Sequence, residues 1–218
     1  MVDLDRPVCY VKPMASDSAK APRERLLNAA NKLFYEEGIH TVGIDRVIES
    51  AGVAKASLYS AFGSKDELVR AYLTQRMDER RKRIEHSISD HTSPRARLIA
   101  IFDGLAEVIA RPTFRGCAFL RASAEGSSGG AAQEVCDASR AWLRNLLLEL
   151  AEAAGAREPT RLAQQLVILY DGTVAAAQMD RDPSVGASAC EMAVTLVDAA
   201  CGPAPRVARV QQRRRARQ

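Results

Sequence analysis

Apolar residues recur at the spacing of an α-helix along almost the whole of this chain. In residues 22–37 they are three, four, seven and eight positions apart, which places them on one stripe of a helix: Leu26, Leu27, Ala30, Leu33 and Phe34. No segment stands out with the alternation of apolar and polar residues that is typical of a half-buried strand. The pattern therefore predicts an all-α fold.

Proline and glycine divide this pattern into about nine segments. Gly38, Gly52 and Gly155 follow periodic runs, and Pro22 and Pro94 suit the first turn of a helix. We expect helices at 22–37, 43–51, 54–61, 64–88, 94–110, 115–125, 131–154, 159–180 and 187–201.

Charge is distributed unevenly along the chain. The net charge is +4, but residues 206–218 contain six Arg and no acid, whereas residues 84–205 contain ten Lys and Arg against fifteen acids. Only the two ends can therefore favour a polyanion. The Arg-rich tail is either a solvated end, a tether that binds DNA without sequence preference, or in part a cloning or frame artefact; we favour the solvated end.

Several classes of protein are disfavoured. No apolar run reaches the roughly 18 residues that a membrane span needs, and the first residues lack the apolar core of a secretion signal. Five widely spaced cysteines without a CxxC pair indicate reduced thiols, so we expect a cytoplasmic protein. No nucleophile–base pair or metal-binding motif is present, so we predict neither an enzyme nor a cofactor.

Residues 43–62 have the arrangement of a helix-turn-helix: two short helices joined at Gly52. On a helical wheel the inward arc of the second helix holds Ala54, Leu58, Ala61 and Phe62. The outward arc is small and polar, which would let the helix enter a DNA major groove: Ala56, Tyr59 and Ser60, flanked by Lys55 and Ser57. The alternative is an ordinary short core helix. Ser64 and Glu67 form a capping box that starts the long helix after it.

This part of the chain resembles the N-terminal DNA-binding domain of the tetracycline-repressor (TetR) family of bacterial transcription regulators. The resemblance covers residues 22–73, including the run "LLNAANKLFYEEGIHTVGIDRVIESAGVAKASLYSAFGSKDELVRAYL". The family pattern is a Gly-Val turn, a Lys, a small residue, a hydroxyl residue, Leu-Tyr, and a Phe followed by Ser-Lys and Glu-Leu. The positions that fit it are Gly52, Val53, Lys55, Ser57, Leu58, Tyr59, Phe62, Ser64, Lys65, Glu67 and Leu68.

Together, the wheel and the resemblance predict DNA contacts. The resemblance implies that Thr41 would cap the helix at 43–51 and touch the DNA backbone, and that Lys65 and Arg46 would meet phosphates. The full set is Thr41, Arg46, Lys55, Ala56, Ser57, Tyr59, Ser60 and Lys65. Ser60 and Ala61 stand where family members often carry larger residues, so we expect fewer backbone contacts in each half-site.

The resemblance also implies a division of the chain into parts. We expect a mobile extension at 1–20, the DNA-binding domain at 21–66, a ligand-binding and dimerisation domain at 67–202, and the Arg-rich tail at 203–218. A homodimer would form through about residues 159–201, although a single-chain core is the alternative. Its apolar anchors would be Leu166, Ile168, Leu169, Val174, Met192, Leu196 and Val197.

An effector pocket is expected in the second domain, although the same residues could be plain core or, for the arginine, surface. The candidates are Phe102, Phe119, Arg121, Trp142 and Tyr170. We therefore predict a ligand-responsive regulator, a repressor that binds a palindromic double-stranded DNA operator as a dimer and is released by a small molecule. The alternatives are a DNA-binding structural protein without an effector and a helical-bundle enzyme.

Overall fold

The computed structural model describes residues 21–125 and 130–202, and the expectations for residues 1–20 and 203–218 lie outside these ranges. The described ranges contain helices and no strand, so the all-α prediction is confirmed. The helices are α1 (Pro22–Glu37), α2 (Ile44–Ala51), α3 (Lys55–Phe62), α4 (Lys65–Ser89), α5 (Pro94–Ile109), α6 (Ala118–Glu125), α7 (Ala131–Ala153), α8 (Pro159–Asp180) and α9 (Val185–Cys201).

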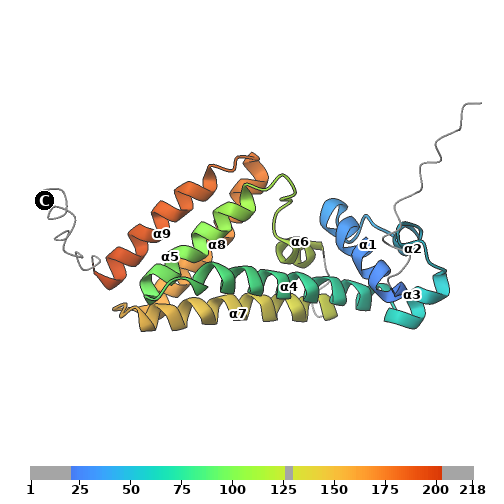
Figure 1. The fold of residues 1–218 in the computed structure, drawn as a ribbon, viewed down its shortest axis with the longest axis horizontal. Helices are drawn as coiled ribbons and strands as arrows, with labels where there is room; N and C mark the ends of the chain where they lie inside the picture. The colour runs from blue at the N-terminus through green and yellow to red at the C-terminus, as the bar shows by residue number, and fades with distance from the viewer. Residues whose placement is uncertain (1–20, 126–129, 203–218) are drawn as a thin grey trace, which may run out of the picture.

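The long helix α4 connects the two ends of the molecule (Figure 1). The short helices α1, α2 and α3 gather around its N-terminal end, and its C-terminal part packs against α5 and α7. The helices α8 and α9 pack on each other and on the same group. The short α6 lies between α1 and the rest, and contacts α4 and α7 (Figure 1). The helix α4 is therefore part of both ends of the molecule.

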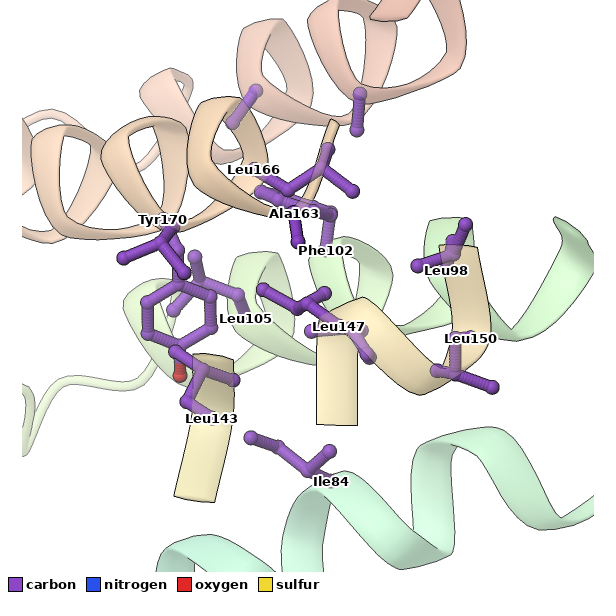
Figure 2. Close-up of a cluster of buried hydrophobic side chains, with 14 of the residues drawn as sticks. Ile84, Leu98, Phe102, Leu105, Leu143, Leu147, Leu150, Ala163, Leu166 and Tyr170 are labelled. Atoms are coloured by element: carbon purple, nitrogen blue, oxygen red, sulfur yellow. The ribbon is translucent and has the colours of Figure 1, made fainter. Parts of the chain in front are cut away.

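Two clusters of buried side chains hold this arrangement together. One joins α1–α4 with residues of α6 and α7 and includes Leu26, Phe34 and Tyr72, with the rings of Phe34 and Tyr72 edge to face at 5.5 Å. The other joins α4, α5, α7, α8 and α9, and Figure 2 shows Ile84, Leu147 and Phe102 facing one another within it. Burying each such side chain stabilises the fold by roughly 1.5–3 kcal/mol. Since α4 contributes to both clusters, it couples them mechanically.

Side-chain caps fix the starts of two helices. Ser64 Oγ accepts a hydrogen bond from Glu67 N at 3.1 Å, and Ser93 Oγ accepts one from Ala96 N at 3.1 Å. Such caps contribute about 1 kcal/mol each because they satisfy amide groups that the helix leaves unpaired. The Ser64 half of the predicted capping box is thus present.

Five helix starts differ from the expected residues, those of α2 and α4 by a single position. Helix α3 begins at Lys55, so Ala54 is its exposed N-cap and not an inward residue as predicted. Helix α6 begins at Ala118 because Gly116 adopts a φ of +93°, which breaks the helical path before it. Helix α9 begins two residues early, at Val185.

The proposed interface anchors separate into three groups, of which one, Leu169 and Leu196, is partly buried against the chain's own core. Leu166, Val174 and Val197 are buried in the chain's own core, so their assignment to a surface between subunits is wrong. Ile168 and Met192 are exposed, at 62% and 55%. None of the helices in the described ranges is both long enough and apolar enough to cross a membrane.

Candidate nucleic-acid interface

The turn between α2 and α3 is closed by backbone hydrogen bonds. Gly52 has φ +61° and ψ 42°, a left-handed conformation that favours glycine. Its N–H donates to Glu49 O at 3.0 Å, and Val53 N donates to Ile48 O at 3.3 Å. These two bonds make a Schellman motif, which ends α2 and turns the chain into α3 within a few residues.

One side of α3 is fixed in the core of the first cluster. Leu58 is fully buried and Phe62 is 9% exposed, and the Arg23 guanidinium lies 4.9 Å from the centre of the Phe62 ring. Eight residues are too few for a stable isolated helix, so these contacts hold α3 in place. The helix therefore has a defined orientation on α1 and α2.

The other side of α3 is open to solvent. Ala56 and Ser60 are exposed, Tyr59 is 46% exposed, and Ser57 is partly buried. No large aliphatic residue interrupts this surface, so the backbone of the helix can approach a partner closely. A phenolic hydroxyl and two serine hydroxyls are available there as donors and acceptors of hydrogen bonds.

Each of the three cations predicted to contact DNA has a partner within the chain. Lys55 Nζ donates to Asp45 Oδ1 at 2.9 Å, and this hydrogen bond raises the pKa of Lys55. Arg46 makes a two-pronged ion pair with Glu37, with 2.8 Å between Nη2 and Oε1. Lys65 Nζ donates to Ile39 O at 2.7 Å. The Lys55 and Arg46 side chains are more than half exposed, so water and salt weaken both pairs and phosphates can compete for the cations.

Thr41 does not cap α2. The N-cap is Gly43, and no side chain accepts a hydrogen bond at that end of the helix. The prediction of the cap is wrong because two residues, Val42 and Gly43, separate Thr41 from Ile44, the first residue of α2. Val42, the neighbour of Thr41, is fully buried. Thr41 itself is exposed, and its predicted contact with DNA backbone stays a prediction.

A second group of contacts joins α6 and the turn before it to the C-terminal end of α1 and the segment that follows α1. Glu125 Oε2 accepts hydrogen bonds from Ile39 N at 2.9 Å and His40 N at 3.0 Å. Arg121 Nη1 donates to Tyr35 O at 2.8 Å, and Tyr35 Oη donates to Gly116 O at 3.2 Å. We call these contacts the α6 clamp. They tie the position of the first three helices to that of α6.

The predicted effector residues are not all in one place. Phe119 and Tyr170 line a pocket of about 380 Å³ between α4, α6, α7 and α8. Phe102 is fully buried beside Tyr170, Trp142 packs under Arg81, and Arg121 belongs to the α6 clamp, so these three lie outside that pocket.

Sequence reasoning missed Arg80, the charged residue that is buried in the part of the chain described by the structure. It lies in the run "QRMDERRKRIEH", which suggests a solvated face. The signal that could have found it is spacing: Arg80 follows Leu73 by seven residues and precedes Ile84 by four, so it continues the apolar stripe of α4. A charge in such a stripe is costly to bury and calls for a partner.

The comparisons with known proteins agree on one family. Residues 26–72 match the family model described as bacterial regulatory proteins, tetR family. The crystal structure of SCO4454, a TetR-family transcriptional regulator from Streptomyces coelicolor, superposes with a TM-score of 0.79 and 32% identity, over 83% of this chain and 96% of that one. A structure from Streptomyces avermitilis gives a TM-score of 0.74 and 34% identity, over 83% and 98%.

Curated relatives match over a shorter stretch. The transcriptional activator FasR of Mycolicibacterium smegmatis is 34% identical over 87 residues, 40% of each chain. The transcriptional repressor KstR2 of the same organism is 30% identical over 99 residues, 44% of this chain and 48% of that one. The chain thus spans less than half the length of these two relatives, one an activator and one a repressor.

Proposed function

Because the chain belongs to the TetR family of bacterial transcriptional regulators, we propose that it is a repressor that binds a palindromic DNA operator as a homodimer and is released by a small-molecule effector. The observation that carries this proposal is the outward face of α3. Ala56, Tyr59 and Ser60 are exposed there, while Leu58 and Phe62 fix the opposite side. A small, polar face of this kind fits a major groove about 12 Å wide.

The phosphate contacts would come from cations around this face. Lys55, Arg46 and Lys65 all lie on or beside α2 and α3, and each is held in a defined position by an acceptor of the chain. On DNA, phosphates would replace Asp45 and Glu37 as partners of the first two. Such contacts position the protein without reading sequence, and they make binding sensitive to salt.

Dimerisation is supported by apolar side chains that the single chain leaves uncovered. Ile168 and Met179 on α8 are 62% and 80% exposed, and Met192 and Val194 on α9 are 55% and 37% exposed. Since α8 and α9 pack on each other, a second copy could cover Ile168, Met179 and Met192 in a four-helix contact, whereas Val194 lies about 200° from Met192 around α9. Two copies related by a two-fold axis would present their α3 helices to successive major grooves about 34–36 Å apart.

The route from effector to DNA would pass through α6. Phe119 and Leu120 of this helix line the pocket, and Arg121 and Glu125 of the same helix form the α6 clamp. A ligand that displaces α6 therefore acts on Tyr35, Ile39 and His40 next to the helix-turn-helix. Release follows if the effector binds the displaced arrangement more tightly than the one that fits DNA.

Binding to the DNA upstream of the protein's own gene tests this function. Fluorescence anisotropy would compare that intergenic duplex with a random duplex of equal length across a salt series. We expect a preference for the intergenic duplex that persists at high salt, and added protein should lower transcription from that DNA in vitro. Equal affinity for both duplexes at every salt concentration would contradict the proposal, and increased transcription would contradict repression.

A further inference from the structure

The pocket between α4, α6, α7 and α8 is lined by one buried cation, and the other buried side chains that line it are mostly apolar. Its deep wall includes Leu143, Val167 and Tyr170, and Phe119 lies across from them on α6. Figure 2 shows Tyr170 of α8 and Leu143 of α7 side by side in the adjoining core. A volume of about 380 Å³ is within the range of small-molecule sites.

Arg80 supplies the cation. Its side chain is 9% exposed, and its guanidinium lies 4.9 Å from the ring centre of Tyr170 and 5.7 Å from that of Phe119. Nη1 donates to Ser139 Oγ at 3.3 Å, and the buried Nε–H has no acceptor. A buried guanidinium normally pairs with an anion. Among the residues that the structure describes, no ion pair involves Arg80.

The two acids that line the pocket already have partners. Asp171 is paired with Arg140, and Asp137 accepts a hydrogen bond from Gln133 Nε2 at 2.8 Å. Asp137 and Arg140 are exposed, Gln133 and Asp171 are partly buried, and none of these four residues is as buried as Arg80. The positive charge at the inner end of the pocket is therefore not neutralised by the acids that line it.

We propose that Arg80 binds the head group of an organic anion and that the effector is a carboxylic acid with an apolar body. This inference rests on the proposed function, since it assigns a chemical class to the effector of that function. The free Nε–H belongs to the edge of the guanidinium fork that takes a planar carboxylate with two parallel hydrogen bonds. The apolar body would lie against Phe119, Leu143 and Tyr170.

The same placement explains how the anion would act on DNA binding. Arg80 lies on α4 and Phe119 on α6, and the guanidinium now contacts the Phe119 ring directly. An apolar body that enters beside Arg80 competes with this contact and moves α6 relative to α4. The α6 clamp transmits that movement to Ile39 and His40.

Isothermal titration of the DNA-free protein tests the assignment. The probes are benzoate, phenylpropionate and octanoate, each with its neutral amide, and inorganic phosphate as an anion without an apolar body. We expect at least one acid to bind at least about tenfold more tightly than its amide and than phosphate, as a buried charge-assisted hydrogen bond implies. No preference for any acid over its amide, or equally tight binding of phosphate, would overturn the proposal.

Variants of two neighbouring arginines separate recognition from folding. Arg80→Met should abolish the preference for the acid and leave the affinity of the amide within about twofold. Arg81→Met is the matched control, since Arg81 lies over the Trp142 ring outside this pocket, and it should keep the preference. A preference retained in Arg80→Met, or lost in Arg81→Met, would contradict the assignment.

Two further measurements keep the test decisive. If Arg80→Met does not fold, Arg80→Lys keeps a cation but loses the Nε–H, and its preference for the acid should fall several-fold; an unchanged preference would overturn the role of the guanidinium. The operator preference of the ligand-free protein is measured separately. The absence of an operator preference would contradict the proposed function. A negative result in the titration would contradict only the assignment of a carboxylic acid as the effector.

Discussion

At the scale of single residues, the Lys55–Asp45 pair sets how much positive charge the protein offers to DNA. Because the pair is exposed, it contributes little to the stability of the fold. The Asp45 carboxylate nevertheless binds the Lys55 ammonium group that a DNA phosphate would otherwise bind. We expect Lys55→Met to reduce the slope of log affinity against log salt by about 2, because each dimer loses two phosphate contacts, without loss of thermal stability. Asp45→Asn is the matched variant and should strengthen binding at low salt. An unchanged slope in Lys55→Met would mean that Lys55 does not contact phosphate.

Cys190 on α9 shows how surroundings control a single thiol. Burial and, secondarily, the neighbouring Asp103 carboxyl raise its pKa from 9.0 to about 11. A raised pKa keeps the thiol protonated, so at pH 8 the thiolate fraction is about a hundredfold below that of an ordinary thiol. Mass spectrometry after timed iodoacetamide treatment should show slow alkylation of Cys190 that rises only as the pH approaches 11. Alkylation at pH 8 as fast as that of glutathione would contradict this.

At the scale of elements, the α6 clamp is the link that can be tested without knowing the operator sequence. Glu125→Ala leaves the amides of Ile39 and His40 without their acceptor. The loss of the partly buried hydrogen bond from the Ile39 amide should lower the free energy of unfolding by roughly 1–3 kcal/mol. We also expect the probe acid to release DNA less effectively from this variant, although the acid still binds the DNA-free protein with wild-type affinity.

The control for the clamp is Glu134→Ala. Glu134 is an exposed acid on α7 whose ion pair with Arg70 lies outside the clamp. When the probe acid is added, the Glu134→Ala variant should release DNA as the wild type does. If Glu125→Ala also releases DNA normally, the effector does not act through the clamp.

Most helix limits followed from the sequence because each is set by local chemistry. Ser64, Ser93 and Pro159 mark the starts of α4, α5 and α8, and Gly52 ends α2, all within a residue of the expected positions. The position of the pocket could not be predicted from the sequence, because it depends on how α4, α6 and α7 pack across one another. Phe102 and Phe119 look alike in sequence, yet one is core and the other lines the pocket. Arg80 lies in a strongly charged run, so in the sequence only its spacing from Leu73 and Ile84 on the apolar stripe of α4 indicates burial, and the packing of α4 shows it.

At the scale of the whole molecule, the uncovered apolar residues of α8 and α9 argue for a second copy of the chain. We expect Ile168→Glu to weaken self-association by at least about tenfold, because it would bury an unpaired charge between the subunits. Sedimentation velocity across a dilution series measures this. Tyr59→Ala removes an exposed aromatic side chain at the other end of the molecule and should leave the dimer intact (Figure 1). A monomeric wild type, or an unaffected Ile168→Glu, would rule out this interface.

The central claim is that the outward face of α3 reads DNA sequence, and Tyr59→Ala tests it most directly. The measurement is the ratio of affinities for the intergenic duplex and a random duplex, taken across a salt series beside thermal unfolding. Because Tyr59 is 46% exposed, the variant should melt within a few degrees of the wild type, while the ratio falls by about tenfold or more. An unchanged ratio in a folded variant, or a variant that unfolds, would contradict the assignment of Tyr59 to the DNA-reading face.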